Sequence, residues 1–122
     1  MNYQQFTENI KSIIPVGTII PNPGGGISTI LSYSDKNIGY KRGNSRITIA
    51  FQDLYDTYVA FKGRKVKTTD LMSYAPKIFD STRGGHSCNC TFLFSILNKL
   101  GKAGEIIGEG KAHHPFYAII KA

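Results

Sequence analysis

The chain has few of the features that mark membrane-bound or secreted proteins. Its apolar residues come in short pieces such as Ile13-Ile14 and Ile106-Ile107, far from the roughly 18 consecutive apolar residues of a membrane-spanning helix. The first eleven residues contain Gln, Asn and Glu, where a secretory signal has a positive start and an apolar run. Only two cysteines are present, Cys88 and Cys90, which excludes a disulfide framework. We therefore expect a cytoplasmic protein that does not contact membranes.

Acidic residues are also scarce. Eight Asp and Glu oppose fifteen Lys and Arg, which gives a formal net charge of +7 and an isoelectric point near 9.5. Hydrophobic residues make up 41% of the chain and aromatic residues 11%, so it has the apolar surface that a disordered basic tail lacks. Its 122 residues are enough for one domain. A single folded, basic domain with an anionic partner is expected.

The positive charge is concentrated between Lys36 and Lys67. Eight cations in this segment oppose only Asp53 and Asp56, so the segment carries +6 of the net charge. A run of charge can be a solvated face that keeps a protein soluble. It is also typical of surfaces that bind nucleic-acid backbones, above all where residues that stack or hydrogen-bond alternate with the cations. The alternating residues here are Tyr33, Tyr40, Asn44 and Ser45.

The first half of the chain is expected to form a helix followed by antiparallel strands. Apolar spacing predicts an amphipathic helix over 3–14 that ends at Pro15. The segment 21–26 holds two prolines and three glycines, which predicts a turn. Three glycines could also cradle a phosphate, but neither a Gly-Lys-Ser/Thr ending nor a Gly-x-Gly-x-x-Gly spacing is present. Residues 27–50 then alternate as a three-stranded meander, with its clearest alternation over 46–50.

Helix signals dominate the second half. Apolar residues at helical spacing predict a helix from Phe51 that Gly63 closes. A strand-like piece over 64–67 leads to a short helix that must end by Pro76. The remaining elements are expected to be a loop over 77–85, a long helix from Ser87 or Asn89 to Leu100, and two strands over 105–107 and 116–120 joined by the loop 108–115.

This order of elements from 51 to 120 resembles the winged-helix arrangement of helix-turn-helix DNA-binding domains. The resemblance covers a little over half of the chain and lies in the order of elements, not in a sequence motif. A tight turn of three or four residues joins the two helices in such domains, whereas about ten residues, 76–85, intervene here. The expected fold is α+β in one domain over 1–122. Residues 1–50 form a helix and a three-stranded antiparallel meander, and 51–122 form a winged-helix-like unit that ends in a β-hairpin.

The resemblance implies that the third helix enters the major groove and that the hairpin loop, the wing, touches the DNA backbone or the minor groove. Residues at the start of that helix would then meet base edges, because Asn pairs with adenine and Arg with guanine. Asn89 or Ser87 can instead be the helix N-cap, and one residue can serve both purposes. Further polar positions that could reach phosphates are Ser95, Asn98 and Lys102, with His113 and His114 in the wing. The predicted nucleic-acid-binding residues are Lys41, Arg42, Arg46, Lys62, Arg64, Lys65, Lys67, Arg83, His86, Ser87, Asn89, Thr91, Lys99 and Lys111.

Three chemical alternatives have the required residue types without the required spacing. A zinc site could use His86, Cys88, Cys90 and His113, but cysteines on a helix do not match the loop pairs of structural zinc sites. Either cysteine could be a nucleophile with a histidine partner, although no signature of such an enzyme is present. Glu109-Gly110-Lys111 is half of a metal-dependent nuclease motif, with Asp70 or Asp80 as the missing carboxylate. We expect no metal, no cofactor and no catalysis.

The sequence therefore predicts a protein that binds double-stranded DNA. Such a protein would act as a transcriptional regulator or as the target-recognition part of a restriction or modification system. The alternative is a protein-interaction module, for example a phage- or plasmid-borne inhibitor whose basic face binds an acidic protein or competes for a nucleic-acid groove.

Overall fold

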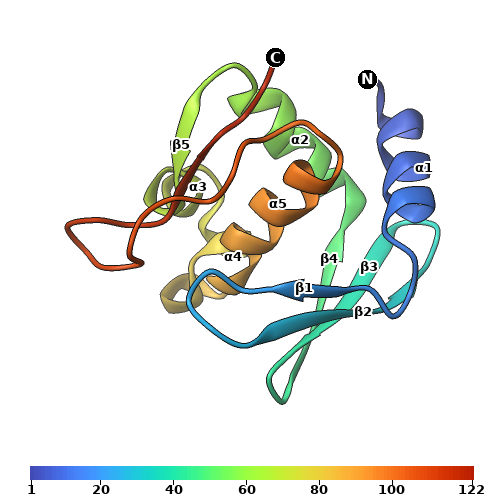
Figure 1. Cartoon of the computed structure of the whole chain (residues 1–122), viewed down its shortest axis with the longest axis horizontal. Helices are drawn as coiled ribbons and strands as arrows, with labels where there is room; N and C mark the ends of the chain where they lie inside the picture. Colours follow the sequence, from blue (N-terminus) through green and yellow to red (C-terminus); the bar gives the residue numbers. More distant parts are fainter. The chain divides into compact units, whose positions relative to one another are not determined.

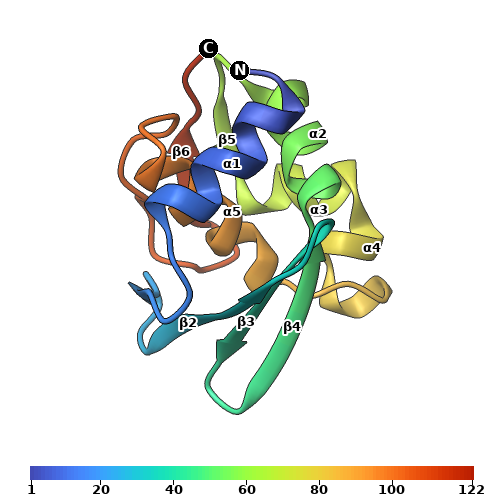
Figure 2. The same cartoon turned by 90° about the vertical axis from the view of Figure 1, so that its right-hand side faces the viewer.

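The computed structural model covers all 122 residues and shows an α+β fold (Figures 1 and 2). The chain divides into two compact units, an N-terminal unit over Met1–Asp56 and a C-terminal unit over Thr57–Ala122. The boundary lies inside helix α2 (Phe51–Phe61), six residues after the boundary expected from the sequence. None of the helices has the length and apolar character that crossing a lipid bilayer requires.

The N-terminal unit begins with helix α1 (Tyr3–Ile13), close to the predicted bounds. Asn2 caps this helix in a capping box, in which its side chain accepts from the Gln5 N–H and the Gln5 side chain accepts from the Asn2 N–H. Phe6 and Ile10 are fully buried. The helix end is attached to the sheet by the Tyr33 hydroxyl, which donates to the Ile14 carbonyl.

A four-stranded antiparallel sheet with the order β1-β2-β3-β4 completes this unit. The three predicted strands are present as β2 (Ile27–Tyr33), β3 (Asn37–Arg42) and β4 (Ser45–Ala50). The fourth strand, β1 (Ile19–Pro21), was not predicted; it pairs with β2 across the predicted proline- and glycine-rich turn. This strand is only three residues long and contains a proline, which is tolerated because β1 is an edge strand.

The two faces of the sheet differ as the alternation predicted. Tyr40 and Ile47 lie opposite each other across β3 and β4, and both are buried. Their neighbours Lys41 and Arg46 also lie opposite each other and are exposed. Since successive strand residues point to opposite sides, both cations are on the face away from the core.

The C-terminal unit contains the last part of α2 and six further elements. Three of them, β5 (Lys65–Lys67), α3 (Thr68–Tyr74) and α5 (Cys88–Lys99), match their predictions to within one or two residues. The predicted loop over 77–85 is wrong, because helix α4 (Pro76–Phe79) and the 3-10 helix η1 (Ser81–Arg83) occupy most of it. Proline ends a preceding helix, but it also suits the first position of a new one, and Pro76 does both here.

Helix α5 lies in the middle of this unit, in contact with α3 and α4 (Figure 1). A helix that is covered on nearly all sides belongs to the core and not to the surface. Its buried residues are Asn89, Cys90, Thr91, Phe92, Leu93, Phe94, Ile96 and Leu97.

The predicted C-terminal hairpin forms only in part. Strand β6 (Tyr117–Ile119) pairs antiparallel with β5, with Val66 and Ala118 as buried partners (Figure 2). The segment 105–107, expected as the partner strand, contributes only the isolated bridge from Ile107 to Tyr117, with hydrogen bonds of 2.9 and 2.8 Å. The main neighbour of β6 is therefore the strand that follows α2, some 50 residues earlier in the chain.

Candidate nucleic-acid interface

The excess positive charge is divided unevenly between the two units. The N-terminal unit has five Lys and Arg against four Asp and Glu, a net charge of +1. The C-terminal unit has ten against four, a net charge of +6. The basic segment 36–67 spans the boundary, so its cations are divided between the two units. An electrostatic argument for an anionic partner therefore applies mainly to the C-terminal unit.

Strand β5 presents two lysines on one face. Lys65 and Lys67 are exposed, whereas Val66 between them is fully buried. Their cross-strand partners in β6 are Ile119 and Tyr117, so all four side chains share one face of the pair. No carboxylate lies within ion-pair distance of either lysine. We call these four residues the β5–β6 face; it is cationic and has an aromatic ring within it.

Aromatic rings orient the cations around β5. The Lys65 ammonium nitrogen lies 4.3 Å from the centre of the Tyr117 ring, and the Arg64 guanidinium carbon lies 5.2 Å from that of Phe61. Such contacts contribute roughly 0.5–1 kcal/mol each at exposed sites. They consume no hydrogen-bond donor of the cation, so the N–H groups stay available for phosphate oxygens. Lys62, the residue after α2, is exposed as well, so all four predicted cations of 62–67 are accessible.

Lys41 and Arg46 form a second, smaller basic site in the N-terminal unit. They are cross-strand partners on the open face of the sheet, and neither forms an ion pair. Like charges directly opposite each other destabilise a sheet, and a bound anion would offset that repulsion. Arg42, the next residue, is half-buried and pairs with Ser45 at the hairpin turn. The three cations predicted in this unit therefore lie within a single hairpin.

Burial contradicts the prediction that Asn89 and Thr91 on α5 contact base edges. Only 3% of Asn89 and 6% of Thr91 is exposed, so neither side chain can reach a base edge. The Asn89 amide donates to the Ile78 carbonyl at 3.0 Å, which makes it a connection between α4 and α5. Among the predicted contacts on this helix only Lys99 is exposed. Polar residues at the start of a helix occur both where helices pack against each other and where a helix contacts DNA, so the sequence did not distinguish the two.

The residues before α5 form a compact polar turn. Asp80 accepts from the backbone N–H and the hydroxyl of Thr82, and these bonds, ahead of the ion pair with Arg83 at 3.4 Å, lower the pKa of Asp80. Ser87 does not cap the helix with its side chain; its hydroxyl bonds Ser81 instead. His86 and Arg83 are both exposed. The structure thus leaves Arg83 and His86 accessible while it engages Ser87 in the turn.

The predicted wing, 108–115, has less free positive charge than the sequence suggested. Glu109 lies 3.3 Å from the Lys111 ammonium and 3.2 Å from Nδ1 of His114. The hydrogen bonds from His114 and then from Lys111 lower the pKa of Glu109. His113 is exposed. Because the negative charge of Glu109 neutralises that of Lys111, the loop adds less positive charge than β5 does. The sequence alone did not predict this ion pair.

The two cysteines and three histidines do not form a metal site. No group of three or more His, Cys, Asp or Glu residues is positioned to hold a metal ion, so the zinc alternative with His86, Cys88, Cys90 and His113 is not supported. Burial raises the pKa of Cys90 to about 12. Its thiol lies 3.6 Å from the Phe79 carbonyl oxygen inside the core. Cys90 therefore acts as a small buried residue and not as an activated nucleophile.

Comparisons with known proteins found no counterpart for this chain. No protein-family model, no curated protein and no solved structure matches it.

Proposed function

We propose that this chain is a small cytoplasmic protein that binds double-stranded DNA through basic β-sheet surfaces. It would serve as a regulator or as the recognition part of a restriction or modification system. The observation that carries the proposal is the β5–β6 face, where Lys65 and Lys67 are exposed, form no ion pair and lie beside Tyr117. Lysines in this setting bind phosphate oxygens and release the counterions condensed on DNA.

The proposed contact differs from the one in winged-helix domains that read DNA with the third helix. The order of elements resembles those domains, but α5 is in the core. Strands and two-stranded ribbons also bind DNA, because the major groove admits a β-ribbon as well as a helix. The β3–β4 hairpin, with Lys41 and Arg46 on its open face, supports the same mode of binding in the N-terminal unit.

Salt-dependent binding tests this proposal. Fluorescence anisotropy with a labelled DNA duplex at 50–200 mM salt should show an affinity that falls linearly on a logarithmic plot. Lys65→Gln and Lys67→Gln should each reduce the slope by about 0.9, the value for one phosphate contact. Lys77→Gln makes the same charge change at an exposed residue of α4, outside the β5–β6 pair, and should leave the slope unchanged. No binding at low salt, or equal effects of all three changes, would refute the proposal.

One observation favours the alternative, an acidic protein as partner. Ile119, on the β5–β6 face, is 56% exposed, and Ile107, bridged to Tyr117, is 49% exposed. Exposed apolar side chains beside lysines suit a protein surface that combines carboxylates with apolar groups. Ile119→Ser should leave DNA binding unchanged if phosphates are the target. A chain that fails to bind DNA but binds an acidic protein, and loses that binding with Ile119→Ser, would establish the alternative.

A further inference from the structure

Strand β4 has one edge without a partner strand. It is the last strand in the order β1-β2-β3-β4, so only β3 pairs with it. The Phe51 N–H donates to the Lys36 carbonyl at 2.9 Å, which fixes the phase of the ladder between β3 and β4. Because every second residue bonds across an antiparallel ladder, Arg46 and Thr48 direct their N–H and C=O groups away from β3. No hydrogen bond engages these groups, and we call this outward side of Ser45–Ala50 the β4 edge.

The β4 edge lacks the features that usually protect the edge of a sheet. The opposite edge strand, β1, has only three residues and contains Pro21. Strand β4 has six residues and no proline, and its pairing with β3 shows no bulge. Short strands, prolines and bulges all hinder the addition of a further strand. Strand β4 therefore offers a regular template to another extended chain.

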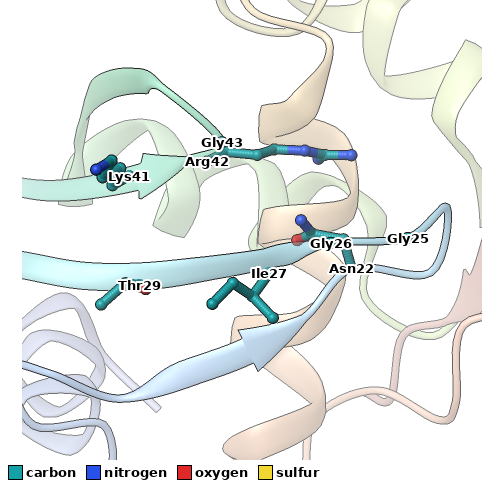
Figure 3. A pocket seen from close by; sticks show the side chains of 8 residues that line it. All are labelled: Asn22, Gly25, Gly26, Ile27, Thr29, Lys41, Arg42 and Gly43. Carbon is teal, nitrogen blue, oxygen red and sulfur yellow. The ribbon is translucent and has the colours of Figure 1, made fainter.

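The side chains beside the β4 edge differ between the two faces of the sheet. Arg46 is exposed on the open face, whereas Ile47 and Ile49 are buried on the other. Lys41 lies opposite Arg46 and shares the open face, while the next residue, Arg42, leaves β3 in a different direction (Figure 3). Neither Lys41 nor Arg46 forms an ion pair. A strand added here would meet positive charge on one face and the margin of the core on the other.

These observations favour one kind of occupant. The β4 edge presents both donors and acceptors, which another extended backbone complements and phosphate groups do not. A second copy is disfavoured, because each chain has a net charge of +7. An acidic residue opposite Arg46 would form a cross-strand ion pair and offset the repulsion from Lys41.

We propose that the β4 edge binds an extended segment of a partner protein, in which acidic and apolar residues alternate. The segment adds antiparallel to β4 as a fifth strand, with its acidic residues on the open face beside Arg46 and its apolar residues beside Ile47 and Ile49. This inference does not depend on DNA binding by the β5–β6 face.

The register of the added strand makes a specific test possible. The residues opposite Arg46 and Thr48 exchange hydrogen bonds with them and share the open face, so they are the acidic residues of the segment. A suitable probe is a labelled peptide of about seven residues in which Glu and Val alternate. N-methylation of its Glu residues removes the donors that bond β4, whereas N-methylation of its Val residues leaves these donors in place.

Fluorescence anisotropy of the peptides with the full chain at low salt measures binding. The unmodified and the Val-methylated peptides should bind with similar affinity, and the Glu-methylated peptide should bind at least about tenfold more weakly. The two methylated peptides have the same charge. Equal affinities for them would show that attraction to a basic protein is the whole effect, and would overturn the proposal. So would the absence of binding at about 0.5 mM protein.

A charge reversal locates the peptide on the protein. Arg46→Glu should weaken binding of the unmodified peptide at least about tenfold, because repulsion replaces attraction opposite its acidic residues. Lys65→Glu makes the same charge change on the β5–β6 face and should have less than about a twofold effect at an exposed site. Equal losses in the two variants would contradict binding at the β4 edge.

Thr48→Pro tests the edge without a change of charge. The Thr48 N–H points away from β3, so a proline here removes a donor of the β4 edge but no bond of the existing ladder. Peptide binding should be lost while the circular dichroism spectrum is retained, and retained binding would refute the proposed pairing.

Two results would assign the edge to a different occupant and overturn the proposal. One is a dimer, seen by sedimentation of the unmodified chain, that Thr48→Pro converts to a monomer. That result would identify a second copy of the chain as the occupant. The other is binding of duplex DNA that Arg46→Glu abolishes while no peptide binds, which would assign the edge to nucleic acid.

Discussion

Replacement of Asn89 by Ala separates the two interpretations of α5. In the structure Asn89 is buried and its amide donates to the Ile78 carbonyl at 3.0 Å. The Asn89→Ala change should therefore destabilise the protein and leave the base preference of any DNA binding unchanged. A base-reading helix would show the opposite, a loss of preference of roughly 1–3 kcal/mol at one base pair with little change in stability.

The size of the effect follows from the partners of the lost hydrogen bond. The Ile78 carbonyl also accepts from the His86 N–H at 3.0 Å, so it keeps one partner and is not left unsatisfied. Loss of the bond then costs about 0.5–1.5 kcal/mol, and removal of the buried carboxamide brings the total to about 1–3 kcal/mol. With about 2.1 cal/mol/K of unfolding entropy per residue over 122 residues, the melting temperature should fall by roughly 4–12 °C.

Urea denaturation followed by circular dichroism measures this loss of stability, and anisotropy with a panel of duplexes measures preference. Asn9→Ala is a matched control, because Asn9 is exposed on α1, and this change should alter stability by less than about 0.5 kcal/mol. Unchanged stability together with an altered preference at one base pair would show that α5 reads DNA and that its placement in the core is wrong.

Two further predictions concern the core of the C-terminal unit. Burial raises the pKa of Cys90 from 9.0 to about 12, so its thiolate fraction at pH 8 should be about a thousandfold lower than that of an ordinary cysteine. The folded Cys88→Ser protein should therefore react with a disulfide reagent far more slowly than the same protein in denaturant. Equal reaction rates would contradict the burial of Cys90. A methyl group at Gly85 would lie 2.7 Å from the Ile78 carbonyl carbon and the Pro76 oxygen, so Gly85→Ala should reduce the free energy of unfolding by about 2–4 kcal/mol in urea titrations. Gly104→Ala, which meets no atom within 4 Å, should change it by less than about 1 kcal/mol, and similar losses in both variants would contradict the predicted crowding.

Most helices and strands were predictable because their signals are local. The alternation of Ile47 and Ile49 with Arg46 and Thr48 predicts β4 and its solvent face, since side chains of a strand alternate whatever the partner strand is. Short elements were the exceptions. Strand β1 has too few residues for a period, and α4 was missed because Pro76 signals the end of one helix and the start of the next equally well.

Local patterns could not say which polar residues are covered. Asn89 and Thr91 look like the exposed start of a helix, but contacts from α3 and α4, whose residues lie 10 to 23 positions earlier, help to make α5 a core helix. The partner of β6 is another such case, because two segments, 65–67 and 105–107, both had the composition of a strand. Backbone pairing in three dimensions selected β5 as the main partner.

The sequence by itself determined that the chain is basic, that it folds as α+β and where most of its helices and strands lie, because charge and periodicity are properties of neighbouring residues. Only the tertiary structure decided which surfaces carry the charge. It divided the cations of 36–67 between two units and placed Lys65 and Lys67 on an open strand face. These results depend on strand register and on burial by segments distant in sequence, which no local pattern encodes.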